Sequence, residues 1–234
     1  MEARSCLLYC RSPIIPRYHR YSILLVPSRT FSESLSPPYL TFHPSIKQKG
    51  ANRPEVSKSL KGSSSSASHW LKANHRLQAI VGSILAVTHP TQYMAGLNML
   101  NAIKTNIGLL REPAEFVKVL DCWHTPFSGV SAICNRETPR HKDVLGRHDW
   151  YDVLVTMGTH PTINFSLPGI RSSFAYCPGT VVALCGRILS HKVERSVEGD
   201  RACFAWFMRE DVRSYLDMAA GPSTVKGVLG SGVL

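Results

Sequence analysis

The stretch that decides how this chain folds is residues 135–152, NRETPRHKDVLGRHDWYD, together with residues 176–209, YCPGTVVALCGRILSHKVERSVEGDRACFAWFMR. Four of its side chains are of the kinds that hold metal ions and carboxylates: His141, Asp143, His191 and Arg201. His191 lies 50 residues after His141, and Arg201 follows His191 by 10 residues. Two imidazoles and one carboxylate on one face of an ion, with the opposite face open, form a typical mononuclear Fe(II) site.

Local sequence context supports this grouping. His141 and Asp143 form an H-x-D pair, and in an extended segment alternate residues point the same way, so both can reach one ion. His191 lies in the strand-like run ILSHKV, where a buried histidine needs a partner that a metal ion would supply. Arg201 opens the next predicted strand, and its guanidinium could pair with both oxygens of a ligand carboxylate. A surface ion pair with Glu198 or Asp200 is the alternative for Arg201.

From residue 129 onward, short β-rich runs alternate with Gly and Pro signals such as Pro168-Gly169 and Pro178-Gly179. This spacing predicts a jelly roll closed from two sheets. The expected strands are Val130–Asn135, Trp150–Met157, Thr162–Leu167, Ser173–Cys177, Thr180–Cys185, Ile188–Val193 and Ala202–Met208.

Helical periodicity precedes these strands. Apolar residues recur at three- and four-residue steps from Ser68, and His89-Pro90 interrupts the pattern. Thr91 is the expected N-cap of a second helix, and Pro113 suits the first turn of a third. A short closing helix is expected over Glu210–Met218. The predicted fold class is therefore α+β, with a double-stranded β-helix (jelly roll) core and N-terminal helices packed on it.

The 234 residues, 44% of them hydrophobic, are enough for one domain and a tail. Residues 1–66 are basic and rich in Ser and Pro, and we expect them to be disordered, with the domain at 67–220 and a flexible tail at 221–234. Twelve of the 27 Lys and Arg residues, but three of the 16 Asp and Glu, lie in residues 1–76. Such a segment favours polyanions, although it could equally be a solvated tail.

Targeting and thiol chemistry give weaker signals. The first thirty residues resemble a mitochondrial transit peptide, although their prolines oppose the amphipathic helix that such peptides form. The longest apolar run, residues 77–87, is too short to span a bilayer, so we expect no membrane association. The seven cysteines form no C-x-x-C motif, which favours reduced, buried thiols. Cys122 and His124 could be half of a zinc site, but no second pair with matching spacing follows.

Several motifs together resemble the TET/JBP-like branch of the 2-oxoglutarate/Fe(II) dioxygenases, the branch that fungi carry, often beside transposons. The likeness covers about 130 residues, from roughly His89 to Val212. The matching segments are HP-x-QY-x-AG at 89–96, NR-x-T-x-x-H-x-D at 135–143, WYD at 150–152, LP at 167–168, Y-x-PGTVV at 176–182, GDR at 199–201 and FMR at 207–209. The cysteine-rich region that animal relatives place before the core is not evident.

The resemblance implies that His141, Asp143 and His191 hold Fe(II) and that Arg201 grips the far carboxylate of 2-oxoglutarate. It implies oxidation of the methyl group of 5-methylcytosine, or of thymine, in DNA, with the base flipped out of the duplex. It also implies a nuclear protein, with the mitochondrion as alternative; we expect a monomer. Asn135 and Arg136 could bind cosubstrate or base, or could hold the loop before the metal ligands.

Two further hypotheses share most of these features. A related dioxygenase that acts on RNA or another substrate would keep every metal-binding residue. A jelly-roll binding protein that has lost its catalytic activity would keep the fold. Trp150 and Tyr151 could stack on a base, although a core position is the commoner role of such aromatics. Asp152 is expected to be structural, and His148 and His160 to lie on the surface.

Overall fold

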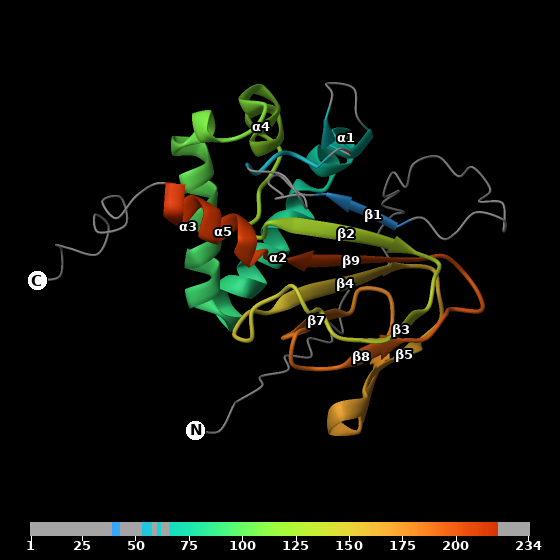
Figure 1. Cartoon of the computed structure of the whole chain (residues 1–234). Helices are drawn as coiled ribbons and strands as arrows, with labels where there is room; N and C mark the ends of the chain where they lie inside the picture. Colours follow the sequence, from blue (N-terminus) through green and yellow to red (C-terminus); the bar gives the residue numbers. More distant parts are fainter. Residues whose placement is uncertain (1–38, 43–52, 58–59, 62–65, 220–234) are drawn as a thin grey trace, which may run out of the picture.

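The computed structural model describes residues 39–42, 53–57, 60–61 and 66–219 of the chain. Within them the strands form two antiparallel sheets, one with the order β1-β2-β9-β4-β7 and one with the order β3-β8-β5-β6 (Figure 1). The larger sheet contains β1 (Tyr39–Phe42), β2 (Gly129–Cys134), β4 (Asp152–Gly158), β7 (Val181–Leu184) and β9 (Arg201–Phe207). The smaller contains β3 (Thr138–His141), β5 (Ile163–Leu167), β6 (Ser172–Tyr176) and β8 (His191–Val193). These sheets confirm the predicted α+β fold with a jelly-roll core.

Alternation along the strands of the larger sheet creates two cores. In β4, Val153 and Val155 pack among the helices, whereas Leu154, between them, packs against the smaller sheet. The same alternation in β9 turns Phe204 and Trp206 toward the helices. Arg201 and Cys203 therefore face the space between the two sheets. The central strands of this sheet are buried on both faces, which explains why their sequences are almost continuously apolar.

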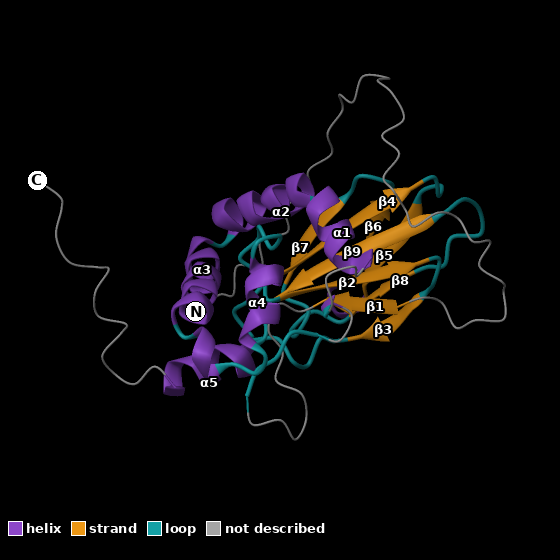
Figure 2. Ribbon diagram, turned by 90° about the horizontal axis from the view of Figure 1, so that it is seen from above, coloured by secondary structure: helices purple, strands orange, loops and turns teal. Residues whose placement is uncertain are grey.

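The helices are α1 (Ser66–Ala73), α2 (His75–Thr88), α3 (Pro90–Thr105), α4 (Pro113–Leu120) and α5 (Glu210–Ala219), with short 3-10 turns at Ile107–Leu109 and Pro168–Ile170. In Figure 2, α1 lies over the strands while α2, α3, α4 and α5 gather on one side of them. Trp70 of α1 contacts Phe204 of β9, with ring centroids 5.1 Å apart. None of the described helices combines the length and the apolar character needed to cross a membrane.

The break between α2 and α3 is capped differently from the sequence prediction. His89, not Thr91, is the N-cap of α3, because its Nδ1 accepts a hydrogen bond from the Gln92 backbone amide at 3.3 Å. Pro90 occupies the first turn, where its missing N–H costs nothing. The opposite nitrogen of His89 donates to the Asp149 carbonyl at 2.6 Å, which ties this cap to the loop that leads into β4.

Part of the segment expected to lie outside the fold belongs to it. The strand β1 pairs antiparallel with β2, from Tyr39 opposite Ile133 to Phe42 opposite Val130. Val56 and Leu60 are core residues with 0% and 1% exposure. The disorder expected for residues 1–66 is therefore wrong at these positions. The remainder of that segment and the tail expected at 221–234 lie outside the described residues.

Several predicted strands are shorter in the structure, and β3, like β1, was not predicted. Strand β4 begins at Asp152 rather than Trp150, and β8 covers only His191–Val193, because the chain from Cys185 to Leu189 forms a hydrogen-bonded turn. The short strand β3 consists of a Pro and three polar or charged residues, so it has no apolar alternation that could reveal it. It nevertheless pairs with β8, and this pairing builds the site.

Candidate metal centre

Strand pairing brings the two distant histidines together. His141, the last residue of β3, lies opposite His191, the first residue of β8, in the antiparallel register. Their ring centroids are 4.2 Å apart. Phe165 of β5 stacks against the buried His191 ring, with a centroid separation of 5.9 Å and an interplanar angle of 6°. The second imidazole is thus fixed by packing, whereas the first lies at the rim of the cavity.

Asp143 completes a three-residue cluster. Its Oδ1 lies 3.6 Å from His141 Nε2, and its Oδ2 lies 3.6 Å from His191 Nε2. One ligand atom from each of the three residues lies within 4.8 Å of the others. Bonds from nitrogen and oxygen ligands to first-row metals are about 2 Å long, so one ion between these atoms could contact all three after small adjustments. The donor set of two imidazoles and one carboxylate fits Fe(II).

Hydrogen bonds fix the orientation of both imidazoles. His141 Nδ1 lies 2.9 Å from the Pro139 carbonyl, and His191 Nδ1 lies 3.1 Å from the Leu189 carbonyl. A carbonyl oxygen can only accept, so each Nδ1 is the donor. In the neutral imidazoles the lone pair is therefore on Nε2, which in both rings faces Asp143. A backbone carbonyl behind each metal-binding ring is a common way to orient such ligands.

The three groups have different proton affinities. The neighbouring Asp143 carboxylate raises the pKa of His141 above its usual range, whereas burial lowers the pKa of His191. Burial works to raise the pKa of Asp143, but His141, His191 and Arg209 nearby together bring it below its usual range. Asp143 is therefore ionised and His191 neutral near neutral pH, which are the forms that bind metal ions.

Arg201 lies at the inner end of the same cavity. Only 2% of the residue is exposed, and its Nη1 donates to the Arg136 carbonyl at 2.8 Å. Its Nε and Nη2 are buried and have no hydrogen-bond partner among the described residues. The guanidinium carbon lies 5.8 Å from the centre of the Tyr176 ring. A buried cation with two unused donors is costly unless a ligand anion accepts from them, so the surface ion pair considered for Arg201 is excluded.

The two residues expected before the metal ligands have different roles. Asn135 has a left-handed backbone, with φ of 50°. Its side chain accepts from the Arg201 backbone amide at 2.7 Å and donates to Asp200 at 2.9 Å. Asn135 therefore holds the loop and the start of β9. Arg136 lines the cavity and supplies the carbonyl that fixes Arg201.

These groups surround one cavity of about 340 Å³ between the sheets. The metal cluster, Arg136 and Arg201 line it, together with apolar residues of β2, β4 and β9. A larger and more open hollow of about 870 Å³ lies beside it, lined by residues 144–149 and the start of α5. Gly146 and Arg209 line both, so the hollow adjoins the cavity without containing the cluster.

Sequence reasoning missed several residues around the cavity. Phe207 and Arg209 line it, and the Arg209 guanidinium lies 4.6 Å from the Phe207 ring centre. Asp152 also lines it, and burial, with the nearby charge of Asp143, raises its pKa well above the usual range. Asp152, Phe207 and Arg209 had no signal beyond their place in the family-like motifs. Gly186, which lies against Asp143 and Asp152, had none.

Other residues considered from the sequence lie away from the site. His160 is buried rather than on the surface. Its burial is tolerated because Nδ1 hydrogen bonds to the Pro161 carbonyl and Nε2 to Thr156 Oγ1. Trp150 belongs to the helix-side core, with 6% exposure. Cys122 is buried with its thiol directed to backbone carbonyls of α4, and it belongs to no metal-binding cluster within the described residues. The zinc alternative therefore gains no support.

Comparisons with known proteins agree with this geometry. The family described as "Tet_JBP: Oxygenase domain of the 2OGFeDO superfamily" matches residues 44–210, which begins ahead of the domain boundary expected at residue 67. No curated protein matches the sequence. Among solved structures, NgTET1 in complex with 5mC DNA is similar, with a TM-score of 0.54 and 14% identity over 74% of this chain. The chain spans 62% of the length of NgTET1, and at this identity the likeness concerns the fold.

Two more oxygenase structures are similar at a lower level. A 2OG-Fe(II) oxygenase family oxidoreductase from Burkholderia pseudomallei has a TM-score of 0.36 and 14% identity, covering 72% of this chain and 65% of its own. The viral collagen prolyl hydroxylase vCPH from Paramecium Bursaria Chlorella virus-1, in its 2OG complex, has a TM-score of 0.28 and 12% identity, covering 34% and 57%. TM-scores this low add nothing to the fold assignment.

Proposed function

This chain belongs to the Tet_JBP family of 2-oxoglutarate/Fe(II) oxygenase domains, and we propose that it oxidises the methyl group of 5-methylcytosine, or of thymine, in DNA. Membership makes it a 2-oxoglutarate-dependent dioxygenase with Fe(II) and 2-oxoglutarate as cofactors. The observation that carries the proposal is the meeting, in one cavity, of the His141, Asp143 and His191 cluster with the Arg201 guanidinium, whose Nε and Nη2 have no partner among the described residues. The fold shared with NgTET1, solved with 5mC DNA, supports the choice of substrate.

Each group has a separate task in this proposal. His141, Asp143 and His191 would hold Fe(II), and Arg201 would pair through Nε and Nη2 with the far carboxylate of 2-oxoglutarate. When bound, iron and 2-oxoglutarate supply the oxidation: dioxygen, 2-oxoglutarate and the methyl group give succinate, carbon dioxide and a hydroxymethyl group. The backbone carbonyls of Pro139 and Leu189 keep both Nε2 atoms directed at the ion.

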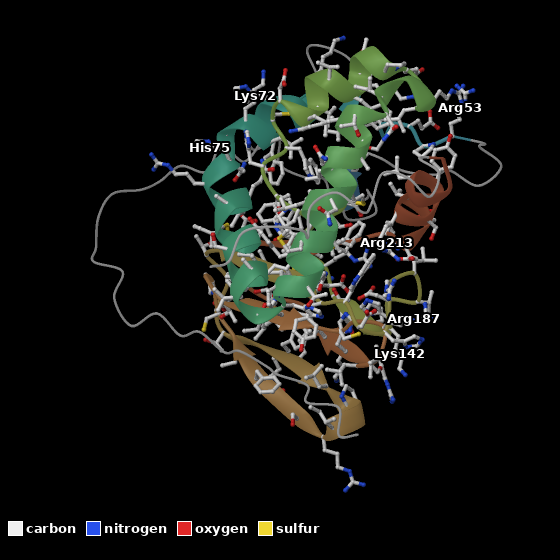
Figure 3. All side chains as sticks on the ribbon, turned by 90° about the vertical axis from the view of Figure 1, so that its left-hand side faces the viewer. Arg53, Lys72, His75, Lys142, Arg187 and Arg213 are labelled. Atoms are coloured by element: carbon white, nitrogen blue, oxygen red, sulfur yellow. The ribbon has the colours of Figure 1, made fainter. Side chains whose placement is uncertain are left out.

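The mouth of the cavity has features that suit a nucleic acid. Arg140 and Lys142 are exposed on the segment that carries His141, and Lys142 and Arg187 lie along the same edge of the molecule (Figure 3). Cations here would contact phosphates, and the stacked Phe207 and Arg209 would offer a flat face to a flipped base. A methyl group inside a duplex cannot reach a cavity of this kind, so the base has to leave the stack.

Turnover of defined oligonucleotides tests the substrate. The purified full chain is incubated with Fe(II), 2-oxoglutarate and a duplex that contains 5-methylcytosine, and hydroxymethylated nucleosides and succinate are measured by mass spectrometry. An unmethylated duplex reports thymine oxidation, and a methylated RNA of the same sequence competes with the DNA. We expect product from DNA and none from the His141→Ala variant. Product from the RNA but not from the DNA would mean that RNA is the substrate. Absence of product from both the DNA and the RNA would refute the proposed activity.

A further inference from the structure

We propose that Gly186 and Asp152 are positioning residues that hold the Asp143 carboxylate in the orientation that metal binding requires. This inference rests on the proposed function, because it concerns the same metal site. Neither residue is part of the three-residue cluster found among the described residues. Both border the Asp143 side chain, and Gly186 also accepts a hydrogen bond from the Asp143 backbone amide.

Gly186 lies where the backbone and the carboxylate of Asp143 both approach it. The Asp143 backbone amide donates to the Gly186 carbonyl at 2.9 Å. A β-carbon at position 186 would overlap Asp143 Oδ2, and it would lie 2.7 Å from Asp152 Oδ2 and 3.1 Å from Asp143 Cγ. The backbone φ of Gly186 is not positive, so the requirement for glycine here is space. Any side chain would push the metal-binding carboxylate out of position.

Asp152 is the second residue that borders the Asp143 carboxylate. It opens β4, pairs in register with Leu184 of β7, and its carboxylate lies beside Gly186, whose backbone amide could donate to it. Because the same missing β-carbon position borders both carboxylates, Asp152 and Asp143 lie against one another across Gly186. In this proposal the Gly186 amide holds the Asp152 carboxylate, and Asp152 in turn limits how far Asp143 can rotate away from His141 and His191.

The arrangement makes Gly186 a junction between two parts of the fold. Its carbonyl accepts from the Asp143 amide in the loop after β3, and its Cα lies beside the carboxylate of the first residue of β4. A ligand residue in a loop would otherwise have more rotational freedom than one in a strand. Residues that orient a metal ligand typically change metal affinity by about 10- to 100-fold when they are replaced.

Mn(II) binding tests this inference without any need for turnover. Calorimetry on the full chain is compared for wild type, Gly186→Ala, Asp152→Ala and Asp152→Asn, with the melting temperature of each metal-free protein measured by circular dichroism. We expect Gly186→Ala to weaken Mn(II) binding about 100-fold and Asp152→Ala about 10-fold. Asp152→Asn keeps the volume and an oxygen for the Gly186 amide, so it should stay within about threefold of wild type.

Controls separate positioning from general damage. Gly169→Ala adds the same methyl group where no atom lies within 4 Å, and it should leave Mn(II) affinity unchanged. A variant with a lowered melting temperature and wild-type Mn(II) affinity would show a structural role alone and overturn the inference for that residue. Asp152→Asn binding as weakly as Asp152→Ala would overturn the proposed acceptor role. If Gly186→Ala does not fold, the two Asp152 variants still test whether the wall of the Asp143 site positions its carboxylate.

His141→Ala separates failure of this inference from failure of the proposed metal site. Wild type that binds no Mn(II), or binds it as well without His141, would refute the metal site itself. If wild type binds and His141→Ala does not, but Gly186→Ala binds like wild type, only the positioning role fails.

Discussion

The two ends of the site cavity differ in how they meet solvent. At the outer end the His141 and Asp143 side chains are 40% and 43% exposed, so an ion there would have room for a substrate and dioxygen. At the inner end Arg201 is 2% exposed and keeps two donors without partners among the described residues. The outer end is open enough for substrate and dioxygen to enter and leave, whereas the inner end encloses a site for one small anion. The two ends should therefore fail in different ways when they are altered.

Loss of a ligand at the outer end should have the largest effect. Replacing Asp143 by Ala removes the only carboxylate of the cluster and leaves two imidazoles, so we expect Mn(II) binding and product formation to fall below detection. Calorimetry and the oligonucleotide assay measure both. The exposed Asp121→Ala variant is the control. Residual turnover near wild type would show that Asp143 is not a ligand.

Loss of the cation at the inner end should spare the metal. Arg201→Met removes two charge-assisted hydrogen bonds to 2-oxoglutarate, which we expect to weaken its binding by about 3 kcal/mol, or roughly 100-fold. Titration with 2-oxoglutarate in the presence of Mn(II) gives this value. Mn(II) affinity itself should not change, and the exposed Arg195→Met variant should match wild type in both. An equal loss of affinity for 2-oxoglutarate and for Mn(II) would show that the two ends of the cavity do not bind separate ligands.

Acidification should also act first at the outer end. His141 has a raised pKa and must lose its proton to bind metal, whereas the lowered pKa of His191 keeps that ring neutral. Mn(II) affinity should therefore be full above the pKa of His141 and fall as the pH drops through it, starting at a higher pH than for an ordinary histidine. Calorimetry at a series of pH values follows this. Affinity that is constant down to pH values below about 5 would contradict the assignment.

The smallest effect should be on the stability of the metal-free protein. Arg201→Met removes the hydrogen bond to the Arg136 carbonyl but also removes a buried charge, two of whose donors have no partner among the described residues. These contributions oppose each other, so we expect the free energy of unfolding to change by no more than about 1 kcal/mol. Urea denaturation measures it. A decrease of more than about 3 kcal/mol in the free energy of unfolding would mean that Arg201 stabilises the fold and is not available to bind a ligand.

Sequence patterns predicted the larger elements and the site residues for identifiable reasons. Alternation in β4 and β9 is strong because both faces are buried, and helical periodicity preceded the strands as expected. The H-x-D spacing correctly indicated that His141 and Asp143 face the same way. The pairing of His141 with His191 could not be read from the sequence, because β3 is polar and its register depends on a contact between strands distant in the chain.

Other features depend on contacts that have no local pattern. The role of Gly186 comes from two carboxylates that meet it from other segments. His160 is polar in sequence but is buried with both ring nitrogens satisfied. Strand β1 lies among prolines and serines that predicted disorder, and it is recognised by its pairing with β2. Asn135 was ambiguous until its hydrogen bonds to Asp200 and to the Arg201 backbone placed it in the loop.

The central claim is that one cavity binds a metal ion at its mouth and 2-oxoglutarate across to its buried arginine. Calorimetric titration of the wild-type chain with 2-oxoglutarate, with and without Mn(II), tests it most directly. We expect binding with Mn(II) present, and binding weaker by at least about tenfold without it, because the ion supplies one of the two anchoring points. Equal affinity in both titrations, or no binding in either, would contradict the account.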